Sequence, residues 1–576
     1  MSDVGGLLPN LVPDIIEILK VSKVDSCSVQ VIKARSVEEG RNIRAVQEGK
    51  TFRCDSGGYD VADTREGSTF VFAIASMTKI FIALAMFLVF QDLPDVDEDE
   101  IWDTKFTDVF KRYSQRLEIR LLPGDPTVKD LLVHRHGVPD LNDFLLAPDG
   151  TPLLSKESFL KIVPDLYKEA RYDQNAASKY SNGNYVLLLM LIEAITKRTF
   201  SDYLSAKVLN PLGMTRTFVS PISDDENKSN WATPFVVYED GQPTQVQNHL
   251  SSSDSAASSV MGMYSCTKDM GILYESFFEG LRGEPRIEKL NERLISRMFG
   301  LGTSRFVSSI SDNEDAGYTA CGLVSLSNSL YLGFHHLNRL ILGNDRSTSF
   351  RLGRGKDFNS MIYGQAGTIT GFSCCSYLVP TSFEAVIVMT NTVGLNDGAD
   401  HVARLILQAL YDLKVPRGRL LKHTSFRQKK VNIVEKAQRS AEQTRRRLEV
   451  LGIRRPQNVT PVRNPERLVG QYKGDYGAQH LIIRNENDQT VVTISDGKSN
   501  KSGDLGLKSL KPRLFRIIPQ EPGIDVFGSW DNLELEDISP ENAPRVTRLS
   551  RTRRTAEGED DEQYKYELLP DPISDH

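Results

Sequence analysis

The sequence has few cysteines, and their placement excludes the most common structural uses of the residue. The 576-residue chain contains only Cys27, Cys54, Cys266, Cys321, Cys374 and Cys375, and none of them shows the spacing of a metal site. Such usage is typical of free thiols in a reducing compartment. The first residues also lack a basic segment followed by a long apolar one, so we expect no secretory signal and a cytoplasmic protein.

The chain also lacks a large excess of charge of either sign. A net charge of -6 gives no electrostatic reason to expect a nucleic-acid partner or binding to an anionic membrane. Hydrophobic residues make up 40% and charged residues 25%, which is typical of a folded globular protein. At this length we expect at least two domains and a large core.

Only residues 70–90 form an apolar run that approaches the length of a membrane span. A spanning helix needs about 20 apolar residues, and a lysine at its centre costs about 2.5–3.5 kcal/mol. Lys79 lies near the middle of this run, and only residues 80–90 follow it without a charge. The run therefore predicts a buried core helix and no membrane span.

The same run contains the first candidate catalytic motif, Ser76-Met77-Thr78-Lys79. On a helix, Ser76 and Lys79 lie one turn apart on the same face. A serine hydroxyl is a weak nucleophile until a nearby base or cation prepares it, and a buried lysine can do so because desolvation lowers the pKa of its ammonium. This S-x-x-K pattern is weak evidence alone, because two fixed residues in four recur by chance.

Two further motifs strengthen the prediction. Tyr180-Ser181-Asn182 precedes an apolar helical segment, and a tyrosine beside an ammonium is a plausible proton carrier because the charge favours its phenolate. Gln365-Ala366-Gly367-Thr368 precedes a strand-like run. A glycine at a strand edge permits close approach of another backbone. Backbone N–H groups there and at Ser76 could stabilise an oxyanion.

With these motifs the chain resembles the class C β-lactamase-like branch of the penicillin-recognising serine enzymes, over roughly residues 26–413. Further stretches are similar to the family: Leu131 to Asp140, with the order Leu-Leu-x-His-x-x-Gly-x-Pro, and Asn210-Pro211-Leu212-Gly213-Met214. The resemblance implies an α+β fold with a β-lactamase/transpeptidase-like catalytic domain, in which an antiparallel sheet is flanked by helices and joined by a helical subdomain. The carboxyl-terminal β region is similar to the lipocalin-like domain often appended to such proteins.

The resemblance also implies a role for each residue of the three motifs. Ser76 would be acylated, Lys79 would keep its proton mobile, and Tyr180 would carry that proton. Asn182 would orient the acyl side chain, and the N–H groups of Ser76 and Thr368 would form the oxyanion hole. No metal or organic cofactor is implied, and His134 and His136, which face different sides of a helix, are interpreted as structural.

The third motif departs from the family, which usually has Lys or His where this chain has Gln365. An uncharged Gln365 favours a neutral ester or thioester over a substrate with a carboxylate, unless Arg351, Arg354 or Lys356 supplies a charge. The predicted function is a serine hydrolase that acts on an ester, thioester or amide. Two alternatives remain open: an acyltransferase of secondary metabolism that moves an acyl group from a carrier thioester to an alcohol, and a non-catalytic binding protein on the same fold.

Composition along the chain predicts four parts. Residues 1–25 form an amino-terminal extension and residues 26–415 the catalytic domain. Residues 416–464 are rich in Arg and Lys, and we expect them to form a linker that contains a helix ending near Gly452. The basic run is most simply interpreted as a solvent-exposed face of this linker. Residues 465–576 contain alternating strand-like runs, among them 513–518, 524–527 and 564–569, which indicate a small β-barrel or sandwich with a charged tail.

Overall fold

The structure is a computed structural model of the whole chain. The residues that it describes are 7–35, 44–55, 58–64, 67–94, 97, 100–114, 125–135, 141–147, 149–168, 180–219, 230–238, 240–247, 254–300, 304–305, 317–320, 324–326, 329–331, 349–351, 361–413, 426–451, 462, 465–474, 479–486, 489–495, 502, 505–511, 514–519, 533–537, 539, 546, 548–553 and 562–569.

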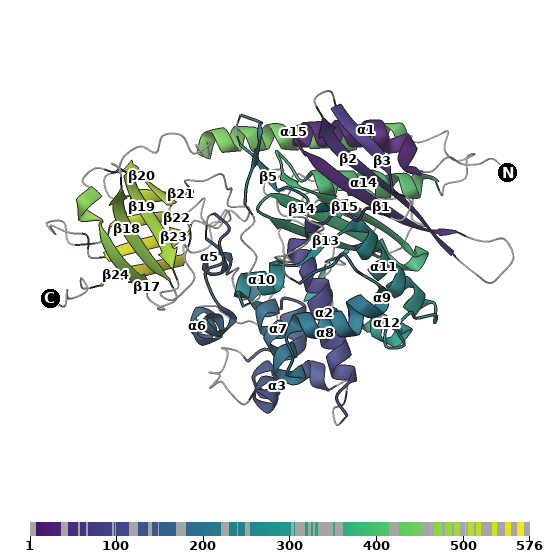
Figure 1. Cartoon of the computed structure of the whole chain (residues 1–576), viewed down its shortest axis with the longest axis horizontal. Coiled ribbons are helices and arrows are strands. Elements are labelled where there is room, and N and C mark those ends of the chain that lie inside the picture. Colours follow the sequence, from purple (N-terminus) through teal and green to yellow (C-terminus); the bar gives the residue numbers. More distant parts are fainter. Residues whose placement is uncertain are drawn as a thin grey trace.

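A nine-stranded antiparallel sheet forms the centre of the larger part of the molecule (Figure 1). In spatial order its strands are β3 (Gly58–Asp63), β2 (Arg44–Asp55), β1 (Ser26–Arg35), β15 (Glu384–Thr390), β14 (Phe372–Val379), β13 (Ile362–Ile369), β10 (Val324–Leu326), β9 (Gly317–Tyr318) and β8 (Ser304–Arg305). β14 and β15 are buried along their whole length, as continuous apolar runs predict for strands covered on both faces. β14 and β15 pair antiparallel, with Tyr377 opposite Val386.

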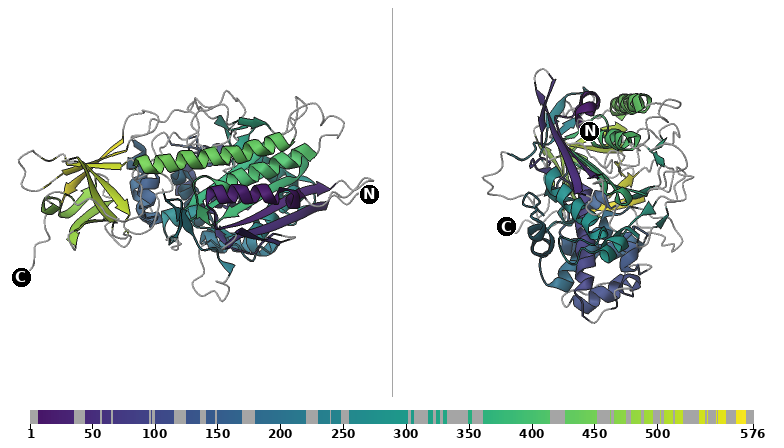
Figure 2. Two further views of the ribbon diagram at one scale, coloured as in Figure 1. Left: turned by 90° about the horizontal axis from the view of Figure 1, so that it is seen from above. Right: turned by 90° about the vertical axis from the view of Figure 1, so that its right-hand side faces the viewer.

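Helices cover both faces of this sheet. On one face α1 (Leu7–Ser22) and α15 (Phe426–Leu451) lie against α14 (Gly398–Leu413), which contacts β14 and β15 (Figure 2). On the other face α11 (Thr267–Leu281) contacts β1 and β15. α1 precedes β1 in the chain. Its buried leucines and isoleucines belong to the same hydrophobic core cluster as residues of β1 and α14.

α2 (Thr78–Gln91) leads from the sheet into a helical subdomain. The larger helices there are α3 (Phe106–Tyr113), α4 (Val128–Leu132), α6 (Lys156–Lys168), α7 (Asn182–Thr196), α8 (Phe200–Leu204) and α12 (Glu292–Gly300). Every residue of α2 from Thr78 to Phe90 is buried, which confirms the predicted core helix. In the part of the chain that the structure describes, no helix has the length and apolar character needed to cross a bilayer.

Short elements complete this larger part of the molecule. The helical ones are α5 (Asn142–Leu145), α9 (Asn210–Leu212) and α10 (Ala256–Met261), with a 3-10 turn η1 (Ala75–Met77). The short strands are β4 (Phe72–Ala73), β5 (Phe235–Val237), β6 (Pro243–Gln245), β7 (Tyr264–Ser265), β11 (Ser329–Tyr331), β12 (Ser349–Arg351) and β16 (Thr392–Val393). α10 is a buried helical turn in a Ser/Ala-rich segment, and the Ser255 side chain caps its start.

The carboxyl-terminal part is a closed antiparallel barrel of eight strands, at the left of Figure 1. They are β17 (Gly470–Gly474), β18 (His480–Glu486), β19 (Gln489–Ser495), β20 (Leu505–Lys511), β21 (Leu514–Pro519), β22 (Leu533–Asp537), β23 (Arg548–Arg553) and β24 (Glu562–Leu568). β17 pairs with β24, which leaves no open edge. The expected strand at 524–527 lies outside the described residues.

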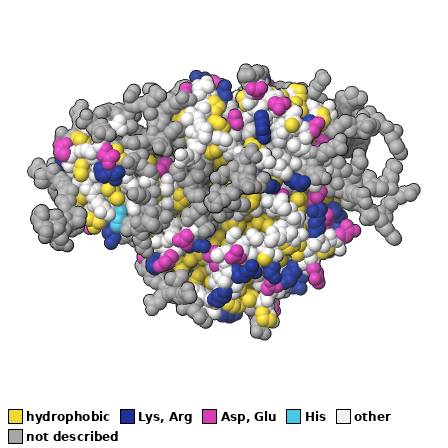
Figure 3. All heavy atoms as spheres, viewed as in Figure 1, with side chains coloured by type: hydrophobic (Ala, Val, Ile, Leu, Met, Phe, Trp, Pro, Cys, Tyr) yellow, Lys and Arg dark blue, Asp and Glu magenta, His cyan; other side chains and the backbone are white. Residues whose placement is uncertain are grey.

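The whole architecture is α+β, with a helix-flanked antiparallel sheet, a helical subdomain and a small all-β region, as predicted. Figure 3 shows acidic and basic side chains interspersed on the visible face, in keeping with the small net charge.

Candidate active site

Ser76 lies on a tight turn directly before the buried helix α2. It occupies the 3-10 turn η1, and the preceding Ala75 has a φ of 45°, a left-handed conformation that is rare outside glycine. Neighbouring backbone holds the turn in place, because Ile74 N donates to Met263 O and Met77 N donates to Ile74 O. The turn presents a half-buried Ser76 side chain next to Lys79, which lies in the first turn of α2.

Lys79 is buried and its ammonium reaches three neutral acceptors. Nζ donates to Ser76 Oγ at 3.2 Å, to Asn182 Oδ1 at 2.6 Å and to Val260 O at 3.4 Å. An ammonium has three N–H donors, so these three acceptors match its full donor set. Nζ also lies 5.1 Å from the centre of the Tyr180 ring, within the range of a cation–π interaction.

Tyr180 approaches Ser76 from the start of α7. Its hydroxyl donates to Ser76 Oγ at 2.7 Å and lies 3.3 Å from Asn182 Oδ1. Ser76 Oγ is therefore in hydrogen-bond contact with both Lys79 and Tyr180 in one half-buried site. The structure thus brings together the three residues for which catalytic roles were predicted, although they come from two separate motifs.

The Asn182 side chain is fully buried, and its partners are protein groups. Oδ1 accepts from Lys79, and Nδ2 donates to Asn142 Oδ1 at 2.5 Å. Asn142 begins α5, and nothing in its sequence neighbourhood marks it as a site residue. These contacts orient the Lys79 ammonium toward Ser76, and the predicted contact of Asn182 with an acyl side chain stays a prediction.

β13 lies against the turn that carries Ser76, and a glycine makes this possible. A Cβ placed on Gly367 would lie 2.1 Å from Ile74 O and 3.1 Å from Ser76 N, so only glycine fits. Thr368 follows in the same strand, opposite Ser373 of β14. The close approach expected of a strand-edge glycine is therefore made to the turn that carries Ser76, and the oxyanion role of the Ser76 and Thr368 N–H groups stays a prediction.

Gln365, the residue that departs from the family pattern, also contacts the turn that carries Ser76. Its Nε2 donates to Ser76 O at 3.3 Å, and the side chain is 4% exposed. Its Oε1 is buried and has no hydrogen-bond partner among the described residues. Of the cations expected to compensate for Gln365, Arg351 ends β12, and Arg354 and Lys356 lie outside the described residues.

His134, interpreted from the sequence as structural, lies directly behind Tyr180. Its ring centre is 4.6 Å from that of Tyr180, and its Nδ1 accepts from Ser181 N at 3.1 Å. Burial and the positive charge of Lys79 hold the pKa of His134 well below its usual value. His134 is therefore neutral at neutral pH, and His136 lies outside the described residues.

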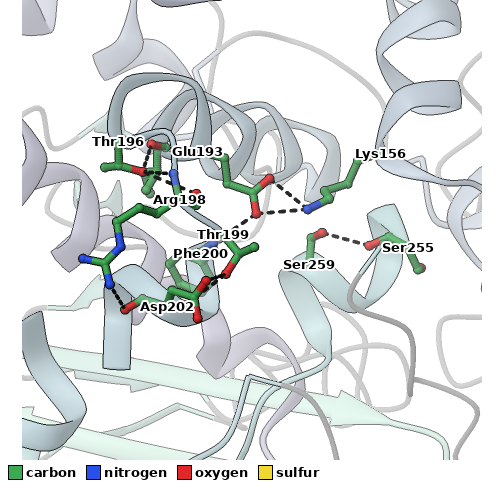
Figure 4. Close-up of polar contacts among 10 residues, drawn as sticks. Lys156, Glu193, Thr196, Arg198, Thr199, Phe200, Asp202, Ser255 and Ser259 are labelled. Atoms are coloured by element: carbon green, nitrogen blue, oxygen red, sulfur yellow. Dashed lines mark hydrogen bonds and ion pairs between the residues drawn. The ribbon is translucent and has the colours of Figure 1, made fainter. Parts of the chain in front are cut away.

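A polar clamp joins the helices behind the site (Figure 4). Lys156 of α6 donates to both carboxylate oxygens of Glu193 of α7, at 3.0 and 2.8 Å. Glu193 also accepts from Phe200 N at the start of α8. On the same side, Lys156 N donates to Asp254 O just before α10, the helix that supplies Val260 O to Lys79.

The described residues contain no group of three His, Cys, Asp or Glu side chains arranged to hold a metal ion.

Comparison with known proteins agrees with this geometry. A family model described as Beta-lactamase matches residues 32–411. A penicillin-binding protein of Bacillus subtilis is 27% identical over 154 residues, 26% of this chain and 30% of that protein. Protein flp of Staphylococcus aureus is 30% identical over 183 residues, 31% of this chain and 34% of that protein. The match thus spans about a third of the length of these curated relatives.

A solved structure resembles the chain over almost its whole length. The octameric penicillin-binding protein homologue from Pyrococcus abyssi superposes with a TM-score of 0.51 and 18% sequence identity, and the match covers 98% of this chain and 100% of that one. At this level of identity the likeness concerns the fold alone.

Proposed function

The chain belongs to the beta-lactamase family of serine hydrolases, and from this premise we propose that it forms an acyl-enzyme at Ser76 from a neutral ester, thioester or amide, which water then hydrolyses. The observation that carries the proposal is the pair of hydrogen bonds on Ser76 Oγ, from Tyr180 at 2.7 Å and from Lys79 at 3.2 Å. A serine can become a competent nucleophile when a group able to serve as its base and a cation both lie within hydrogen-bond distance of its oxygen.

The contacts support a proton path that needs only Tyr180 and Lys79. As the phenolate, Tyr180 takes the Ser76 proton while Oγ bonds to the carbonyl carbon. The phenol then returns that proton to the leaving oxygen, sulfur or nitrogen as its bond to carbon breaks. In the second half, the phenolate takes a proton from water, whose oxygen attacks the acyl carbon, and the phenol reprotonates the departing Ser76 Oγ. The Lys79 ammonium stabilises the phenolate throughout.

The proposed preference for an uncharged substrate rests on Gln365. A Lys or His at this position would offer a positive group to a substrate carboxylate, whereas Gln365 offers an amide. Its Nε2 is engaged by Ser76 O and its Oε1 is buried, so Gln365 supplies no positive charge to a bound substrate. We therefore favour an acyl substrate that carries no carboxylate near the scissile carbonyl.

Intact-protein mass spectrometry tests the proposal directly. The protein is mixed with simple esters, acyl thioesters, amides and a penicillin, beside Ser76→Ala. We expect a mass gain of one acyl group from a neutral donor, absent in Ser76→Ala, and its decay in water. Decay only after an alcohol is added would identify an acyltransferase, and no adduct from any donor or from a fluorophosphonate would leave a binding protein on this fold.

Two matched variants test the assigned roles. Tyr180→Phe removes the hydroxyl that contacts Ser76, so we expect the acylation rate to fall by about 100- to 10,000-fold. Tyr472→Phe is the control, because its hydroxyl donates to Leu468 O and Val546 O in the carboxyl-terminal barrel and does not reach Ser76. It is expected to acylate normally and to lose about 1 kcal/mol of stability. Equal rates in both variants would remove Tyr180 from the proton path.

A further inference from the structure

We propose that His134 is a positioning residue that fixes Tyr180 in line with Ser76 by accepting the N–H of Ser181. The inference rests on the proposed function, since it concerns the tyrosine that carries the proton. Ser181 is the residue between Tyr180 and Asn182, and its backbone N–H donates to His134 Nδ1 at 3.1 Å. One hydrogen bond thus anchors the backbone that carries both side chains in contact with Lys79.

The imidazole is enclosed on two sides by aromatic rings. Its centre lies 4.6 Å from the Tyr180 ring and 5.1 Å from the Tyr185 ring, with interplanar angles of 35° and 34°. Tyr185 is itself fixed, because its hydroxyl donates to Leu132 O. His134 therefore fills the space between a rigid tyrosine and the reactive one, and Tyr180 has little freedom to move away from Ser76.

The neutral state of His134 allows its Nδ1 to accept a hydrogen bond. Nδ1 can accept the Ser181 N–H only when the ring is neutral with its proton on Nε2. His134 is fully buried and lies close enough to Lys79 for the ammonium to oppose a second positive charge, so its pKa is held well below 6.5. Asp130 is near in sequence, but its carboxylate is bound to Arg135 and Thr127.

The backbone conformation of His134 is a second, independent indication that the surrounding structure holds this residue in place. Its φ is 53°, in the left-handed region that non-glycine residues enter at a cost of about 1–3 kcal/mol. Such a conformation persists where the surrounding structure holds it, and it often occurs at functional sites. Here it turns the side chain from the end of α4 toward the start of α7.

The same conformation supplies a matched pair of variants. Asparagine tolerates left-handed φ better than most residues, and its Oδ1 occupies the place of the histidine Nδ1 along the side chain. Glutamine carries the same amide one carbon further out. His134→Asn therefore keeps the acceptor for Ser181 N–H, and His134→Gln displaces it.

The test measures Ser76 labelling by a fluorophosphonate, ester turnover, and amide hydrogen exchange at Ser181, all on the full chain. We expect His134→Gln to lower the labelling rate by about 100-fold, with kcat falling and KM nearly constant, because a small displacement of the proton carrier has an effect of that size. The Ser181 amide should exchange faster in this variant. His134→Asn should keep labelling within about tenfold of the parent and retain protection at Ser181.

Three outcomes would overturn the inference: unchanged labelling in His134→Gln, equal impairment of both variants at equal folded fraction, or loss of labelling in His134→Asn with an unchanged melting temperature. If His134→Gln does not fold, the inference is still tested by His134→Asn, through its labelling rate, its melting temperature and the hydrogen exchange of its Ser181 amide. Failure of the proposed function would look different, because the parent protein itself would not be labelled at Ser76.

Discussion

At the scale of single residues, the site depends on Gly367, where there is no room for the side chain of any other residue. Gly367 has no unusual backbone conformation, but a Cβ there would lie 2.1 Å from the carbonyl oxygen of Ile74. Because that atom is backbone and holds the turn of Ser76 through the Met77 N–H, it cannot move without moving the nucleophile. Adding a methyl group at Gly367 should therefore both destabilise the fold and displace Ser76 from its position in the site.

We expect Gly367→Ala to lower the rate of Ser76 labelling at least about 100-fold and stability by about 1–3 kcal/mol, through separation of β13 from the turn. Labelling kinetics and thermal melting measure the two effects. Gly300→Ala is the control, because a Cβ there meets nothing within 4 Å. Normal labelling by Gly367→Ala would show that β13 does not set the position of Ser76.

Sequence motifs identified the residues that we propose to react, but not the groups that orient them. Ser76, Lys79 and Tyr180 lie in short patterns whose spacing has a chemical meaning, so they could be named before the fold was known. Val260 contributes only its backbone carbonyl to Lys79, which no residue type can signal. Asn142 and His134 reach the site through tertiary contacts with Asn182 and Ser181, and single residues of those types are most often structural.

At the scale of elements, long apolar segments were predictable and short polar ones were not. α2, α7 and the β14–β15 pair follow from largely apolar runs, because burial on several sides leaves few alternatives. α10 could not be recognised in the same way, because its six residues are too few to show a helical period. Its helical state depends on the Ser255 cap and on packing against α2 and α7.

The Lys156–Glu193 pair is the clearest interaction between elements behind the site. The two side chains are 17% and 22% exposed and join α6 to α7, while Glu193 also caps α8. A double-mutant cycle with Lys156→Met and Glu193→Gln should give a coupling free energy of about 0.5–3 kcal/mol, as found for contacting groups in a shared network.

The exposed pair Lys161 and Glu157, on the same helix α6, is the matched control for that cycle. Its side chains are 54% and 61% exposed, so we expect a coupling of only about 0.3–0.5 kcal/mol and strong weakening by salt. Thermal or denaturant unfolding of the four single and two double variants supplies the values. Equal coupling in both pairs would mean that the clamp does not stabilise the junction of α6, α7 and α8.

At the scale of the whole molecule, a buried polar cluster joins the central sheet to the helices on one of its faces. Asp400 of α14 accepts from Arg404 Nε at 2.8 and 2.9 Å and from Tyr377 of β14 at 2.6 Å. Asp397 accepts from Ser373 of β14 at 2.9 Å. Burial and the charge of Asp400 raise the pKa of Asp397 to about 7, and burial lowers the pKa of His401 to about 4.

These two shifts make opposite contributions to stability over the same range of pH. Folded His401 stays neutral, while the unfolded imidazole binds a proton below about pH 6.5, so its contribution is complete above 6.5 and is lost as the pH falls toward 4. Folded Asp397 keeps its proton up to about pH 7, while the unfolded carboxyl releases it near 3.8. Its contribution is therefore present at low pH and is lost as the pH rises.

Between pH 4.5 and 6.5 we expect His401→Gln and Asp397→Asn to change the pH dependence of stability in opposite directions. His401→Gln removes a group that favours folding at higher pH, so the gain in melting temperature from pH 4.5 to 6.5 should shrink relative to the parent. Asp397→Asn removes the opposing group, so that gain should grow. Each difference corresponds to about 1.4 kcal/mol per pH unit for one proton. Asp60→Asn, which removes an exposed carboxylate of β3, is the control, and a shift of the same sign in both buried variants would contradict the assignment.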